Sequence, residues 1–114
     1  MKNPIAVLLL TFSAGAVACG TTHYIDTDRY GNNICRDMDG KMVAIQGTVQ
    51  NCPAFYQNSS DKYGNEFCGL GKIHAYDLSK GCLSFMSDDF DKHGNKICTL
   101  NGKPVISLIK NIKR

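Results

Sequence analysis

The stretch DKYGNEFC, residues 61–68, decides the fold, because close copies of it occur twice more in the chain. Residues 28–35 read DRYGNNIC and residues 91–98 read DKHGNKIC, so the pattern D-[RK]-[YH]-G-N-x-[IF]-C occurs three times. Self-similarity of this kind is typical of a repeated structural unit. The sequence therefore predicts three tandem copies of one small unit.

Each copy ends in a cysteine, and another cysteine precedes that one by 16 residues. Six cysteines allow many disulfide connectivities, but this equal spacing favours pairing within each unit. A zinc site is the alternative, yet the pairs lack the C-x2-C spacing of common zinc sites. The predicted disulfides are Cys19–Cys35, Cys52–Cys68 and Cys82–Cys98.

The N-terminus has the pattern of a secretory signal peptide. Lys2 precedes the apolar run IAVLLLTFSAGAVA, residues 5–18, which ends in the small-residue motif Ala16-Val17-Ala18. The run is shorter than the roughly 20 apolar residues that a membrane-spanning helix needs. A signal peptide over residues 1–18 predicts a secreted, extracellular protein in a compartment that permits disulfides. A lipid-anchored Cys19 is the alternative, although Ala16 stands where such motifs usually have Leu.

Turn chemistry predicts the structure within each unit. The segment D-x-x-G-N favours a turn capped by the aspartate carboxylate, with glycine at positive φ. Hairpin corners are expected at Asp39-Gly40, at Leu70-Gly71 and at Asn101-Gly102. A run of β-prone residues follows each corner, at 42–45, 73–76 and 105–109.

The expected fold is small, disulfide-rich and β-rich, with three tandem disulfide-looped β-hairpin repeats. The repeats are assigned to residues 19–51, 52–81 and 82–114, here called the first, second and third units. None of them is large enough to bury a core alone, so we expect the three to pack together. The third unit ends in a basic tail, SLIKNIKR from residue 107, which we expect to be a solvated end.

Charge and motif content exclude several function classes. The 114-residue chain has 13 Lys and Arg against 10 Asp and Glu, a net charge of +3, which is too balanced for binding driven by nucleic-acid phosphates. His23, His74 and His93 do not occupy equivalent positions in the units. The catalytic and phosphate-binding motifs of common enzymes do not occur. We therefore expect no enzymatic activity, no catalytic residue and no cofactor.

Two local motifs concern ions and modification. Asp26-x-Asp28 and Asp89-x-Asp91 resemble the start of calcium-binding loops, which place oxygens at alternate positions. A turn stabilised by aspartate side chains explains the same letters and is the preferred interpretation, so no metal ligand is assigned. Asn58 begins the sequon Asn-Ser-Ser, an N-glycosylation site in a secreted eukaryotic protein.

The second unit carries a family resemblance. CPAFY at 52–56, followed by YGNEFCGL at 63–70, resembles the Kazal family of serine-protease inhibitors, in the cysteine-reduced form of secreted oomycete proteins. The resemblance implies that Ala54–Phe55 is the reactive bond, that Asn65 supports the inhibitory loop, and that the partner is a serine protease. The family continues into a helix after this cysteine, whereas Gly71 predicts a hairpin here.

Two functions follow from these observations. The first is a degenerate Kazal-like inhibitor of extracellular serine proteases. The second is a small secreted effector or binding module that recognises a host or surface protein or a carbohydrate, without inhibitory activity. Both are extracellular, and neither involves nucleic acid or a membrane span.

Overall fold

The computed structural model describes residues 16–17, 19 and 22–113. The predicted signal peptide lies outside these residues except for Ala16–Val17, so it stays a prediction. Ala16–Val17 forms β1, which pairs in parallel with β12, Asn111–Ile112.

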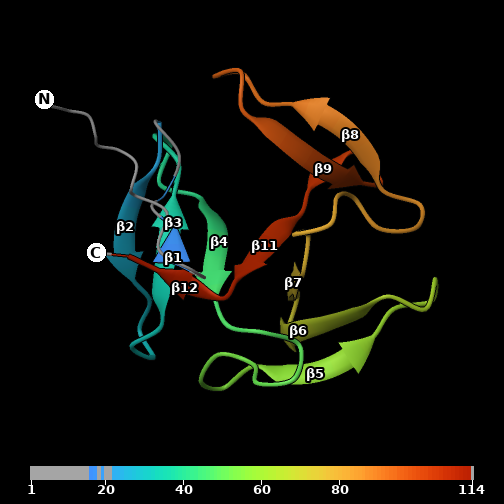
Figure 1. Cartoon of the computed structure of the whole chain (residues 1–114), viewed down its shortest axis with the longest axis horizontal. Helices are drawn as coiled ribbons and strands as arrows, with labels where there is room; N and C mark the ends of the chain where they lie inside the picture. The colour runs from blue at the N-terminus through green and yellow to red at the C-terminus, as the bar shows by residue number, and fades with distance from the viewer. Residues whose placement is uncertain (1–15, 18, 20–21, 114) are drawn as a thin grey trace, which may run out of the picture.

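Each unit contributes antiparallel strands, and the three sets surround a common centre (Figure 1). The strand pairs are hairpin-like, and the described residues contain no helix. The expected small, disulfide-rich and β-rich fold is thus confirmed. The strands are β2 (Tyr24–Thr27), β3 (Asn33–Arg36) and β4 (Met42–Gln46); β5 (Gln57–Ser60), β6 (Glu66–Leu70) and β7 (Ile73–Tyr76); and β8 (Ser87–Phe90), β9 (Lys96–Leu100) and β10 (Lys103–Pro104).

The repeated phrase forms the turn that joins the first two strands of each set. In all three turns, Oδ1 of the aspartate accepts hydrogen bonds at 2.9 Å from the N–H groups two and four residues on. The glycine has a φ of 85° to 87°, which few other residues adopt at low cost. The interpretation of Asp28, Asp61 and Asp91 as turn-stabilising residues is therefore confirmed.

The second corner of each set differs between units. In the second unit, Leu70 and Ile73 pair across a two-residue corner, so a hairpin follows Cys68 as expected. In the third unit Asn101 and Gly102 both have positive φ, as a tight hairpin corner requires. The two-residue corner expected at Asp39-Gly40 is wrong. The connection spans residues 37–41, because the Asp37 carboxylate accepts two backbone N–H groups and builds a wider turn.

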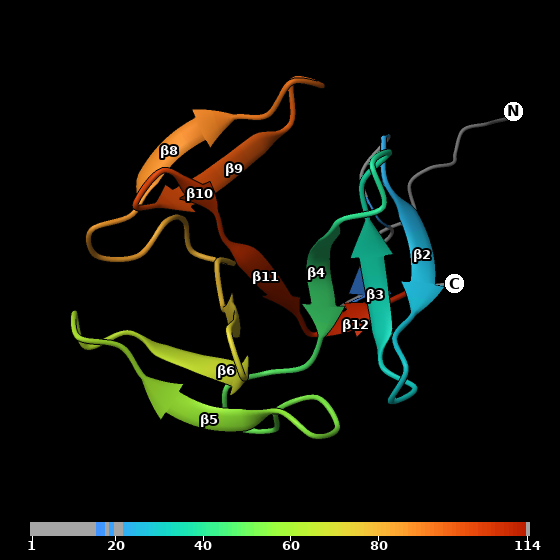
Figure 2. The same cartoon turned by 180° about the vertical axis from the view of Figure 1, so that it is seen from behind.

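Strands from all three units meet in parallel at the centre of the molecule (Figure 2). Here β11 (Ile106–Ile109) lies between β4 and β7, and the sheet order is β2-β3-β4-β11-β7-β6-β5. The third unit reaches the centre because its chain leaves β9 after Val105, whose N–H donates to the Cys98 carbonyl at 2.9 Å, and continues into β11. The central pairing makes one sheet from parts of all three units.

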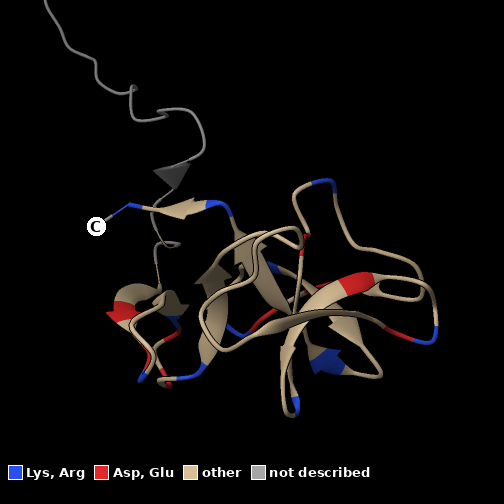
Figure 3. Cartoon of the chain, turned by 90° about the horizontal axis from the view of Figure 1, so that it is seen from below, with Lys and Arg blue, Asp and Glu red and all other residues tan. Residues whose placement is uncertain are grey.

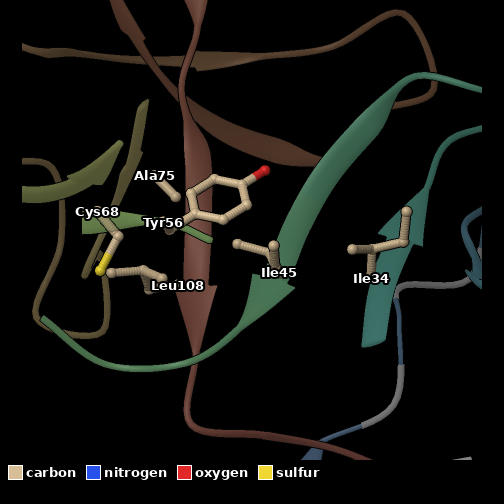
Figure 4. Close-up of a cluster of buried hydrophobic side chains, with 6 residues drawn as sticks. All are labelled: Ile34, Ile45, Tyr56, Cys68, Ala75 and Leu108. Carbon is tan, nitrogen blue, oxygen red and sulfur yellow. The ribbon is translucent and has the colours of Figure 1, made fainter. Parts of the chain in front are cut away.

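The main core lies where these central strands meet, and Figure 4 shows its six buried side chains. Ile45, Cys68 and Ala75 have no exposed surface, so small shape changes at these positions are costly. The complete cluster is Ile34, Ile45, Tyr56, Cys68, Ala75 and Leu108. Each unit contributes to it, as expected for units that cannot bury a core alone.

The C-terminal segment is ordered, which corrects the expected solvated tail. Residues 106–109 form the central strand β11, and Ile112 is 5% exposed in a second cluster with Cys35 and Ala44. The Ile112 N–H donates to Oε1 of Gln46 at 2.9 Å. Leu108 and Ile112 are therefore core residues, and the side chains of Lys110 and Lys113 lie at the surface.

The disulfides are those predicted from the spacing. Cys19–Cys35, Cys52–Cys68 and Cys82–Cys98 join Cα atoms 5.7, 5.6 and 5.5 Å apart. Three such bonds require an oxidising environment. Within the described residues, the structure has no helix long and apolar enough to cross a bilayer.

The disulfides give a stability prediction. We expect Cys52→Ala/Cys68→Ala to lower the free energy of unfolding by about 3 kcal/mol, because the bond closes a loop of about 15 residues in the unfolded chain. The disulfide Cys82–Cys98 closes a loop of the same length but lies outside the main core. We therefore expect Cys82→Ala/Cys98→Ala to lower the free energy of unfolding by less. Urea unfolding followed by circular dichroism measures both losses. A larger loss for the second pair would contradict the packing role of Cys68.

Candidate functional site

The loop closed by the second disulfide carries the Ala54–Phe55 bond at an exposed tip. The chain reverses direction here, because the Tyr56 N–H donates to the Pro53 carbonyl at 2.9 Å. Phe55 occupies the third position of this β-turn with a φ of 73°. A positive φ at that position is typical of a type II turn. The bond that the Kazal resemblance selects therefore lies between the two central residues of a tight turn.

A side chain of the first unit holds this turn from outside. Asn32 Oδ1 accepts the Ala54 N–H at 2.9 Å, and Asn32 Nδ2 donates to the Ala54 carbonyl at 3.1 Å. Asn65, which the resemblance assigns to this loop, donates to the Ser84 carbonyl at 3.2 Å, in the loop of the third unit. Asn32 thus supports the loop that contains Ala54, and Asn65 supports the loop after its own. The resemblance compares one unit at a time, so it does not consider support between units.

The third asparagine of the series returns to the first unit. Asn95 Nδ2 donates to Thr22 Oγ1 at 2.7 Å and lies 3.5 Å from His23 Nε2. The turn of each unit therefore contacts the cysteine loop of the next, and the third closes the ring onto the first. His23, which had no assigned role, lies at this closing junction.

Two aromatic pairs lie at the first two junctions. The Tyr30 and Phe55 rings stack with centroids 4.5 Å apart, and the Tyr63 and Phe85 rings lie 4.4 Å apart. Each phenylalanine is the third residue after the first cysteine of its unit. That shared spacing was the sequence signal for these pairs, and it becomes readable only when the cysteine loops are aligned with one another. We call these pairs the aromatic platforms.

The platform phenylalanines combine exposure with backbone strain. Phe55 is 71% exposed and Phe85 is 73% exposed, with φ angles of 73° and 66°. A bulky residue in this conformation is an outlier that costs about 1–3 kcal/mol. Burial of these side chains does not offset that cost, since both are open to solvent. Strained residues of this kind are concentrated at ligand-binding sites.

The third junction has different chemistry. His93 stands in place of the platform tyrosine, and the facing loop has Thr22 where the other loops have phenylalanine. Lys92 Nζ lies 2.7 Å from Asp39 Oδ2, and hydrogen bonding to Lys92 holds the pKa of Asp39 below its ordinary value. The closing junction therefore contains an ion pair in addition to the Asn95 hydrogen bond, and it has no exposed phenylalanine.

The turn of the second unit is also tied to the core. The Tyr76 hydroxyl donates to Asp61 Oδ2 at 3.0 Å. Burial and this hydrogen bond to a carboxylate raise the pKa of Tyr76 to about 12. Burial alone would raise the pKa of Asp61, but hydrogen bonds from the Asn65 and Tyr63 N–H groups and from Tyr76 lower it below its usual range. Asp61 thus couples the repeated turn to the central strand β7.

The remaining candidate ligands have other partners. The Asp26 carboxylate lies 2.7 Å from Arg36 Nε, and Asp89 Oδ1 accepts the Phe90 N–H. Asp88 lies near the sulfurs of Cys82 and Cys98, but those sulfurs are joined in a disulfide and offer no thiolate to a metal. These oxygens and sulfurs therefore serve structural bonds.

Asn58 lies on the edge strand β5, and its side chain is exposed. Its amide donates to the Val49 carbonyl at 2.9 Å and to Glu66 Oε1 at 3.2 Å. A glycan attached to the Asn58 amide nitrogen would replace one of the two hydrogen atoms that this nitrogen carries. Glycosylation at Asn58 stays a prediction, and the position is accessible.

A cleft of about 940 Å³ opens between the first and third units, with Met42, Ile97 and Val105 among its apolar lining residues. Its charged lining residues are three aspartates and three lysines: Asp37, Asp88, Asp91, Lys41, Lys96 and Lys103. This balance selects neither an anionic nor a cationic ligand. The aromatic platforms are the more specific candidate site.

Comparisons with protein-family models, with curated proteins and with solved structures give no match for this chain.

The Tyr76–Asp61 bond gives a pH prediction. Among the five tyrosines, Tyr76 should ionise near pH 12, whereas Tyr76→Phe should remove that step from the phenolate absorbance titration. The raised pKa favours the folded state with neutral Tyr76, so this stabilisation is present below about pH 10 and lost as the pH rises through about 12. Asp61→Asn should return the Tyr76 pKa toward 10. A Tyr76 titration unchanged by Asp61→Asn would show that the hydrogen bond is absent in solution.

Proposed function

We propose that this protein is a secreted, non-catalytic binding module whose ligand stacks on the exposed faces of Phe55 and Phe85. The observation that carries the proposal is the pair of aromatic platforms, where two strained phenylalanines stay exposed above a tyrosine ring. Exposed aromatic rings supply a large contact area at low conformational cost.

Rigidity supports this function. Each platform phenylalanine lies in a turn closed by a backbone hydrogen bond, from Tyr56 to Pro53 or from Met86 to Leu83. The tyrosine behind it, the asparagine of the preceding unit and the disulfide of its own unit further restrict the loop. A site that is already ordered loses little entropy when it binds a ligand.

Secretion is part of the same proposal. The predicted signal peptide and the oxidising environment that three disulfides require both support it. The exposed faces of the platforms would then meet extracellular surfaces or polymers.

Kazal-like protease inhibition stays a prediction. In its favour, Ala54 and Phe55 lie on an exposed loop that a disulfide closes and Asn32 supports. Against it, inhibition of this kind needs an extended, substrate-like segment, and the turn at Ala54–Phe55 reverses the chain. The geometry therefore supports the binding module better.

A protease panel separates the two functions. If the protein is a binding module, it should not inhibit elastase-like, subtilisin-like or trypsin-like serine proteases. Ala54→Arg should then leave the rate of substrate cleavage by each protease unchanged. Ser84→Arg, at the equivalent position of the third unit, is the matched control. Inhibition that shifts from elastase-like to trypsin-like proteases in Ala54→Arg, and not in Ser84→Arg, would establish the inhibitory function instead.

Removal of the platforms tests the binding function directly. We expect Phe55→Ala/Phe85→Ala to abolish retention on immobilised polysaccharides with only a small loss of stability, because each ring contacts a tyrosine but lies outside the buried core. Phe90→Ala is the control, since Phe90 is 66% exposed but lies on strand β8, outside the platforms. Affinity chromatography on chitin, cellulose, xylan and polygalacturonate measures retention. Equal retention of the double variant and the unsubstituted protein would overturn the proposed site.

A further inference from the structure

Each aromatic platform has a cation beside it. The Arg29 guanidinium lies over the Tyr30 ring, 6.0 Å from its centroid, and Lys62 Nζ lies 5.3 Å from the Tyr63 centroid. Arg29 and Lys62 occupy the same position of the repeated turn, directly before the platform tyrosine. In each platform, one tyrosine ring therefore contacts both the phenylalanine ring and a cation.

These two cations are available to a ligand. Among the described residues, the ion pairs are Arg36–Asp26 and Lys92–Asp39, and neither includes Arg29 or Lys62. Lys92 is the third member of the series, and its charge is taken by Asp39 at the junction that also lacks the phenylalanine. The free cation and the exposed ring thus occur together at two junctions and are both missing at the third.

The distribution of charge narrows the class of anion. Figure 3 shows basic and acidic residues interspersed along the chain. A nucleic acid needs an extended set of cations along its phosphates, whereas each platform offers a single one. An exposed ring with one cation near it suits a polymer whose units have an apolar face and which has one acidic group on every unit or on every second unit.

We propose that the two platforms bind an anionic polysaccharide, with a sugar ring stacked on Phe55 or Phe85. Its carboxylate, or that of a neighbouring sugar, pairs with Arg29 or Lys62. This proposal rests on the proposed function and adds its ligand class. Two equivalent sites on one rigid protein bind a long chain more tightly than a short one, because the second contact is intramolecular.

Polygalacturonate and its fully methyl-esterified form are the probes, since esterification removes the charge and keeps the sugar. Isothermal titration should show binding of the acid form and at least about tenfold weaker binding of the ester. Binding should also weaken as salt increases, because both platform cations are exposed. A long acid chain should bind about 10²-fold more tightly than a digalacturonate, the lower end of the usual gain from linked sites.

Substitution of the cations identifies their role. Arg29→Gln/Lys62→Gln should reduce binding of the acid form to that of the ester, and Lys92→Gln should leave it unchanged, with urea unfolding as the check on folding. Equal binding of acid and ester, or full binding by Arg29→Gln/Lys62→Gln, would overturn the anionic ligand while leaving the platforms as binding sites. No binding of the acid form would also overturn it. Full binding by Phe55→Ala/Phe85→Ala would overturn the proposed function as well.

Discussion

The side-chain amide of one asparagine in each repeated turn holds the three units in their arrangement. Asn32, Asn65 and Asn95 receive fixed positions from the aspartate at the start of their own turn, and each then hydrogen-bonds to the following unit. A hydrogen bond of this kind contributes only about 0.5–1.5 kcal/mol. Its importance is geometric, because it fixes where the cysteine loop of one unit lies relative to the turn of another.

The aromatic platforms depend on this arrangement. Tyr30 belongs to one unit and Phe55 to the next, so their rings stack only when Asn32 has positioned the loop that contains Phe55. The disulfide of that loop and the buried Tyr56 restrict it from the other side. A backbone conformation that disfavours phenylalanine can persist here because several independent contacts determine it.

The central parallel strands explain why the chain is one structure and not three beads. An isolated unit has a short hairpin and one disulfide, with too little apolar surface for a stable core. The strand β11 supplies Leu108 to a cluster that also contains Ile45 and Ala75 from the other two units. The apolar residues of the C-terminal segment are thus needed for the core, although the lysines among them give the segment the composition of a solvated tail.

Local features of this protein could be predicted from its sequence because they depend on residues close together in the chain. The turn at Asp61 is specified by the carboxylate, the glycine and the amide within five positions, and the disulfides follow from a constant spacing of 16 residues. The hairpin after Cys68 follows from Gly71. The wider connection at 37–41 was missed because Asp39-Gly40 alone suits a tight corner, while the Asp37 carboxylate selects a longer one.

The sequence by itself determined the β-rich class, the pairing of the cysteines and the repeated turn, since propensity, spacing and side-chain capping are local properties. Only the tertiary structure decided which residues form the candidate site. Phe55 meets Tyr30 and Phe85 meets Tyr63 across unit boundaries, and no local pattern encodes a contact between residues more than twenty positions apart. The physical reason is that the packing of one unit against the next, and not the conformation of either alone, brings these rings together.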